Sequence, residues 1–176
     1  LKEEIGIPIH LHTHDTSSNQ IATLLKAYEA GVDIVDAAIS SMAGFTSQPS
    51  LNSLVAALQG LERETGLDPD NLQKLSDYWE DVRRFYAPFE SGMMAPSTEV
   101  YKHEMPGGQY TNLHQQAKAV GLEHRWEEVK EMYATVNRMF GDIVKVTPSS
   151  KVVGDMALFM VQNNLTEEKV YEIGDT

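Results

Sequence analysis

Three histidines recur at every second position in residues 10–16, which read His-Leu-His-Thr-His-Asp-Thr. Side chains alternate between the two faces of a β-strand, so His10, His12 and His14 would share one face. Two neutral imidazoles held close together at the end of a strand are typical ligands of an open metal site. The alternative is a cluster of hydrogen-bonded core histidines, and the spacing alone leaves both interpretations open.

A second group of polar side chains, Thr147, Ser149 and Ser150, surrounds Pro148 at a predicted helix start. Hydroxyl groups in this position usually accept hydrogen bonds from the unpaired backbone N–H groups of the first helical turn. Capping is therefore the default interpretation, and a reacting hydroxyl is the alternative. Pro148 favours an extended backbone at Thr147, which would allow that residue to present its hydroxyl to a pocket.

The elements around the histidines predict an α/β fold with parallel strands. The apolar run Ile5–Leu11 is typical of a strand buried on both faces, and residues 33–39 form a second such run. Each run is followed by a helical pattern, and this alternation indicates a parallel sheet or barrel. Ligands of such folds gather at the carboxyl ends of the strands, where residues 14–16 and 40–48 would meet.

The chain becomes helical throughout from Asp70 onward, and residue 66 is the predicted subdomain boundary. Apolar residues from Leu72 to Phe89 form a helical stripe, which we interpret as core rather than as an aromatic binding platform. His103, His114 and His124 lack ligand spacing and are expected at the surface. The expected helix starts are a capping box of Ser17 with Gln20, and then Ser50, Asp70, and Thr111 or Asn112 after a break at Pro106-Gly107-Gly108.

Composition excludes several classes of function. The 176 residues include 26 acidic and 14 basic side chains, for a formal net charge of −12, so nucleic acid and anionic membranes are unexpected partners. No cysteine is present, so a metal would have to bind to histidine, a carboxylate or a modified side chain. We expect a soluble chain, since no apolar run reaches about 18 residues.

Four stretches together resemble one family, the carboxyltransferase domain of the pyruvate carboxylases, which are biotin-dependent enzymes. They are residues 10–17, 46–50, 106–113 and 145–155, and their order and spacing match the family over the whole chain. The resemblance implies that residues 1–66 are the last two β/α units of a TIM-type (β/α)8 barrel. Residues 67–176 would then be part of the mostly α-helical funnel over the barrel mouth.

The resemblance also implies roles for individual residues. His12 and His14 match two metal ligands, Thr147 matches a threonine that shuttles a proton between substrate and biotin, and Ser150 matches a residue of the biotin pocket. A site of imidazoles and carboxylates suits Zn²⁺ or Mn²⁺. The family's remaining ligands, an aspartate and a carbamylated lysine, and its substrate-binding arginine would precede Leu1. Both ends of the chain look cut, since it begins at Leu1 inside a helix-like stretch and stops at Thr176 just after an apparent helix. With these groups absent, we expect the chain to be inactive alone.

The implied reaction moves CO₂ from carboxybiotin to pyruvate and forms oxaloacetate. Its implied partners are pyruvate, oxaloacetate, the biotin carrier domain of the same enzyme, and further copies of the chain, since the family forms tetramers. The sequence does not choose between the cytoplasm and the mitochondrial matrix. Two alternatives stay open: a decarboxylase, transcarboxylase or aldol-type lyase of the same superfamily, and a non-catalytic structural piece.

Overall fold

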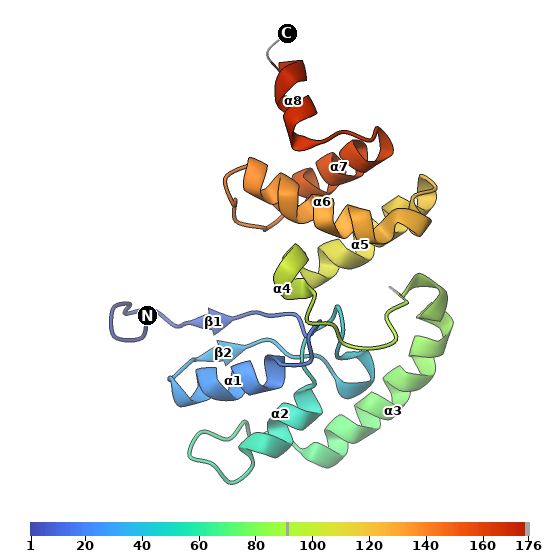
Figure 1. The fold of residues 1–176 in the computed structure, drawn as a ribbon. Helices are drawn as coiled ribbons and strands as arrows, with labels where there is room; N and C mark the ends of the chain where they lie inside the picture. Colours follow the sequence, from blue (N-terminus) through green and yellow to red (C-terminus); the bar gives the residue numbers. More distant parts are fainter. Residues whose placement is uncertain (91, 175–176) are drawn as a thin grey trace. The chain divides into compact units, whose positions relative to one another are not determined.

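The computed structural model describes residues 1–90 and 92–174, which form two compact units, Leu1–Ser97 and Thr98–Thr176 (Figure 1). Unit 1 mixes helices with two short strands, and unit 2 is helical wherever it has regular structure. Residue 66 stays a prediction as the boundary between barrel and funnel.

Unit 1 contains a two-stranded parallel sheet, β1 (His10–Leu11) and β2 (Ile34–Val35). His10 is in register with Ile34, and an isolated parallel bridge joins Ala38 to Ser50. The sheet is smaller and more exposed than predicted. Ile34 of β2 is 49% exposed, because no further strand in the described residues covers it, and Ile7, which precedes β1, is 68% exposed.

Two helices cover this sheet, α1 (Gln20–Glu29) and α2 (Leu51–Leu58). Their buried leucines Leu24, Leu54 and Leu58 form the core of the unit. Ser50 caps α2 as predicted, because its side chain accepts a hydrogen bond from the Ser53 amide. The capping box expected at Ser17 is wrong, since Asn19 is the cap residue of α1 and the Asp15 carboxylate accepts the Gln20 amide hydrogen instead.

The long helix α3 (Pro69–Tyr86) follows, flanked by the short helices η1 (Ser40–Met42) and η2 (Ala87–Phe89). A start near Asp70 was expected, and the cap is Asp68, because Pro69 favours the first helical position and the Asp68 carboxylate accepts the Asn71 amide hydrogen. The predicted core stripe is only partly buried. Leu72 is buried, but Tyr86 and Phe89 are exposed.

Unit 2 comprises five α-helices among the residues that the structure describes, α4 (Val100–His103), α5 (Gly107–Ala119), α6 (Trp126–Met139), α7 (Ser149–Gln162) and α8 (Glu167–Gly174). The short helix η3 (Glu123–Arg125) precedes α6. Side chains of α5, α6 and α7 form a fully buried core that includes Leu113, Tyr133 and Val153. This core is larger than that of unit 1.

Two expectations for unit 2 are wrong. Helix α5 begins at Gly107, not at Thr111 or Asn112, because the Pro106 carbonyl accepts the Tyr110 amide hydrogen and so starts the first turn among the glycines. His103 is 5% exposed rather than at the surface, since its ring packs beside Tyr110 and accepts the Met105 amide hydrogen. Within the described range, no helix is long and apolar enough to cross a membrane.

Candidate active-site residues

The predicted histidine face exists, and Asp36 organises it. The Asp36 carboxylate, just beyond β2, contacts His10 Nε2 at 2.7 Å through one oxygen and His12 Nδ1 at 2.6 Å through the other. Histidines two residues apart on a strand lie on one side, so a single carboxylate reaches both. These two hydrogen bonds lower the pKa of Asp36 below its usual value, which keeps the carboxylate ionised.

His12 and His14 point their Nε2 atoms at each other across 3.4 Å. His14 Nδ1 donates to the Thr46 carbonyl at 2.7 Å, and a carbonyl can only accept a hydrogen bond. His12 Nδ1 faces the ionised Asp36 carboxylate, which is also an acceptor. In the neutral form of both imidazoles, each Nε2 atom therefore carries a free lone pair.

This arrangement fits two ligands of one metal ion. Nitrogen ligands lie about 2.0–2.1 Å from Zn²⁺, and two of them around one tetrahedral ion are separated by roughly 3.3–3.4 Å. Outer partners that hold the second ring nitrogen are a regular feature of histidine metal ligands. The described residues contain no group of three histidine or carboxylate side chains that could hold an ion by itself, so a metal here needs further ligands.

The loop at residues 44–48 completes the surroundings of His14. The Asp15 amide donates to the Ser47 carbonyl at 2.8 Å, next to the contact between His14 and Thr46. The segments predicted to meet at the carboxyl ends of the strands thus do meet. Sequence reasoning missed Asp36 and Thr46, although Asp36 lies inside the predicted strand 33–39, beside the histidine strand.

In unit 2, Thr147 lies in the exposed turn before α7, and its peptide bond to Pro148 is cis. Pro148 is the cap residue of α7 and forms no side-chain cap. Among the described residues, no hydrogen-bond partner holds the Thr147 hydroxyl, so the capping interpretation is wrong for this residue. Ser149 organises the turn instead, since its hydroxyl accepts the Val146 amide hydrogen at 3.1 Å.

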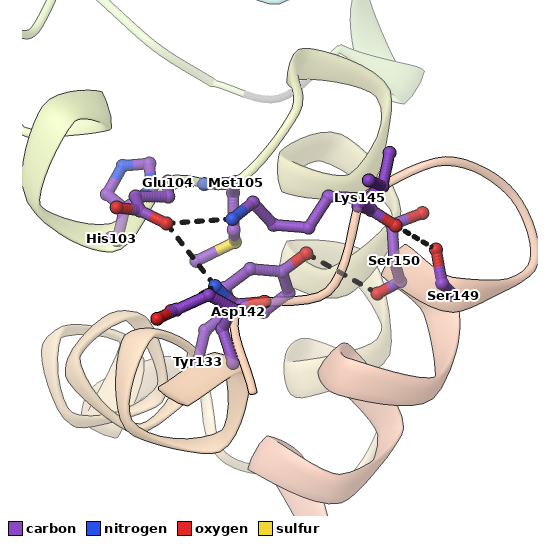
Figure 2. Close-up of polar contacts among 10 residues, drawn as sticks. His103, Glu104, Met105, Tyr133, Asp142, Lys145, Ser149 and Ser150 are labelled. Carbon is purple, nitrogen blue, oxygen red and sulfur yellow. Dashed lines mark hydrogen bonds and ion pairs between the residues drawn. The ribbon is translucent and has the colours of Figure 1, made fainter. Parts of the chain in front are cut away.

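Ser150 is buried in the first turn of α7, below this exposed threonine. Its carbonyl accepts a hydrogen bond from the Tyr133 hydroxyl at 3.5 Å (Figure 2). Burial, with a smaller contribution from the charge of Glu104, raises the pKa of Tyr133 to about 12, so the phenol remains a donor. His12 and His14 thus belong to unit 1, and Thr147 and Ser150 belong to unit 2.

The comparisons with known proteins match both units. The family described as "HMGL-like" matches residues 1–78, and the family described as "Conserved carboxylase domain" matches residues 100–176. The pyruvate carboxylase of Bacillus subtilis is 65% identical over 176 residues, which is all of this chain and 15% of that protein. The pyruvate carboxylase of Staphylococcus aureus is 59% identical over 174 residues, or 99% of this chain and 15% of that protein.

Among solved structures, the chain is similar to the carboxyl transferase domain of Rhizobium etli pyruvate carboxylase with pyruvate and biocytin. The TM-score is 0.91 at 61% identity, over 94% of this chain and 28% of the other. The chain thus spans about 15% of the length of its curated relatives. It belongs to the pyruvate carboxylase family and corresponds to a segment of the carboxyltransferase domain.

Proposed function

We propose that this chain is part of the carboxyltransferase site of a biotin-dependent enzyme that carboxylates pyruvate to oxaloacetate. The observation that carries the proposal is the pair of Nε2 atoms of His12 and His14, 3.4 Å apart, with both Nδ1 atoms held by acceptors. The structure of the Rhizobium etli domain with pyruvate and biocytin supports the same substrates for this chain.

Residues 1–66 would supply the last two β/α units of a (β/α)8 barrel, and residues 67–176 part of its helical funnel. The parallel pairing of β1 with β2 supports this assignment, as does the HMGL-like match over residues 1–78. The exposed Ile34 of β2 supports it too, because a neighbouring strand of a closed barrel would cover it.

His12 and His14 would hold a divalent ion, Zn²⁺ or Mn²⁺, through their Nε2 atoms. When bound, such an ion would polarise the substrate carbonyl, and carboxybiotin would supply the carboxyl group and accept a proton on its ureido nitrogen. Asp36 and the Thr46 carbonyl would fix the two rings, so that neither ligand has to reorient when an ion binds.

Thr147 would relay the proton. Its Oγ atom would take a proton from the pyruvate methyl group while its own proton passes to the biotin nitrogen. The new carbon–carbon bond of oxaloacetate then replaces the carbon–nitrogen bond to biotin, so atoms and electrons balance. Two features support this role: the hydroxyl is exposed, and no cap or other hydrogen bond in the described residues engages it.

Ser150 would line the pocket that receives biotin, at the buried start of α7. A biotin carrier domain of the same protein would deliver the carboxylated cofactor, and the assembled enzyme would be a homo-oligomer, a tetramer in the family. We propose the cytoplasm or the mitochondrial matrix as its compartment.

The proposal is tested on the full-length protein that carries this segment. We expect net oxaloacetate formation when pyruvate is added to the protein with its biotin carboxylated, at a rate that depends on pyruvate concentration. A protein that only decarboxylates oxaloacetate, or that transfers the carboxyl group to another acyl substrate, would contradict the proposal in favour of a related decarboxylase or transcarboxylase.

A further inference from the structure

The segment between α6 and α7, residues 140–148, carries Thr147 and is tied to the end of α4 by an ion pair. Lys145 Nζ lies 2.7 Å from Glu104 Oε2, although 41 residues separate the two in the sequence (Figure 2). The Lys145 side chain is 19% exposed and that of Glu104 is 51% exposed. Most of the Lys145 side chain is therefore buried between its backbone and the Glu104 carboxylate.

A buried amide extends this contact to the other end of the segment. Asn137, which is 1% exposed, points its Nδ2 group at Glu104 Oε2 (3.4 Å) and at Asp142 Oδ1 (3.2 Å). Asp142 lies near the start of the segment, and Lys145 lies two residues before Thr147. Glu104 and Asn137 therefore hold the segment at two points, while Ser149 fastens its far end through Val144 and Val146.

Glu104 occupies a backbone conformation that disfavours glutamate, which indicates that its carboxylate is needed at this position. Glu104 ends α4 in the left-handed conformation, with φ of 58°. Glycine is the residue that occupies this cap position without steric cost. A glutamate here accepts that cost, and its carboxylate makes the contacts with Lys145 and Asn137.

We propose that the Glu104–Lys145 ion pair positions the Thr147 hydroxyl for proton transfer, an inference that rests on the relay role proposed above. Glu104 and Lys145 are positioning residues, because they act on the backbone of the segment and not on the substrate. The hydroxyl itself stays free of partners, as a group that must both accept and donate a proton requires. Misplacement by about 1 Å can cost a reaction about 100-fold.

The test is a set of variants of the full-length enzyme. Lys145→Met should lower kcat for carboxyl transfer on the order of 10- to 100-fold, with the KM for pyruvate unchanged. Lys145→Arg keeps the charge and should restore most of the rate. Glu104→Gly should lower kcat to a similar extent without lowering the thermal unfolding temperature, because it removes the carboxylate and relieves the left-handed backbone together.

The matched control is Lys118→Met, which breaks another lysine ion pair of unit 2, with Glu123 at 3.6 Å. We expect it to leave kcat unchanged. In a Thr147→Ala background, Lys145→Met should cause no further loss, since a positioning residue has no effect once the group it positions is gone.

Two outcomes would overturn the inference. One is wild-type kcat in Lys145→Met, and the other is an equal loss from Lys145→Met with and without Thr147. Both outcomes can be distinguished from failure of the relay itself. If Thr147 is not the relay, the Thr147→Ala single variant keeps high activity, and this result does not depend on any substitution of Lys145.

Discussion

The two groups of candidate residues are held in opposite ways. In unit 1, the candidate ligand atoms, Nε2 of His12 and of His14, belong to rings whose Nδ1 atoms are fixed, His12 by Asp36 and His14 by Thr46. In unit 2, the hydroxyl of Thr147 is free, and its neighbours Lys145 and Ser149 carry the contacts. A metal ligand works best when its lone pair is fixed in direction, whereas a proton relay must turn between two partners.

The two units also differ in the size of their hydrophobic cores. Three buried leucines form the core of unit 1, while Ile34 of β2 and Ile7 before β1 are exposed. Unit 2 encloses a larger core of α5, α6 and α7, in which Tyr133 and Val136 are fully buried. We infer that the histidine pair depends on neighbouring strands for its rigidity, while the Thr147 turn rests on the packed helices below it.

The largest expected effect is loss of the proposed metal. His14→Ala or His12→Ala in the full-length enzyme should remove most of the bound ion and most carboxyl transfer, because each supplies one of the two facing Nε2 atoms. His10→Ala is the matched control and should keep the metal, since its Nε2 atom is engaged by Asp36. Elemental analysis after gel filtration measures this, and full occupancy in His14→Ala would refute the ligand assignment.

The next effect concerns the free hydroxyl. Thr147→Ala should lower oxaloacetate formation by roughly 10²- to 10⁴-fold, the usual contribution of a proton-transferring group, with metal content and unfolding temperature unchanged. Thr147→Ser keeps the hydroxyl and should keep most of the rate, and carboxylation of biotin by the rest of the enzyme should persist. Retention of more than about a tenth of the turnover in Thr147→Ala would exclude the relay.

A smaller effect is expected from Asp36, which fixes the His12 ring. Asp36→Asn keeps the size of the side chain but removes the charge and one acceptor, so the His12 ring loses the partner that orients it. We expect metal affinity to fall by about 10- to 100-fold, as for other outer partners of metal-binding histidines. Competition with a chelator measures this directly, and unchanged affinity would show that Asp36 does not orient the ligand.

The smallest effect probes the core of unit 2. Burial, reinforced by the charge of Lys130, lowers the pKa of His103 to about 4, while Glu99 and Glu127 oppose the shift. The unfolded chain then binds a proton that the folded chain does not between about pH 6.5 and 4, so stability falls as the pH drops through this window.

His103→Asn can still accept the Met105 amide hydrogen but cannot titrate. Thermal unfolding of the variant should therefore decline less than that of the wild type between pH 7 and pH 5. An identical decline in both proteins would mean that the burial of His103 does not contribute to the pH dependence.

Much of the candidate site could be predicted from local sequence. The shared face of His10 and His12 follows from the two-residue period of a strand, and the meeting of residues 14–16 with residues 40–48 follows from the alternation of strands and helices. Helix starts were less predictable. The starts at Asp68 and Pro106 differ from the expected ones because several neighbouring residues at each end have comparable capping potential, and local contacts, Asp68 with the Asn71 amide and the Pro106 carbonyl with the Tyr110 amide, choose among them.

Only the tertiary structure determined the hydrogen-bond and ion-pair partners of these residues. Asp36 reaches His12 across 24 residues of sequence, His14 reaches Thr46 across 32, and Lys145 reaches Glu104 across 41. The residue types were visible in the sequence, and so was the chemistry that each can perform. Which acceptor faces which donor is set by the register of β1 against β2 and by the packing of the helices of unit 2, and no local pattern contains either of these.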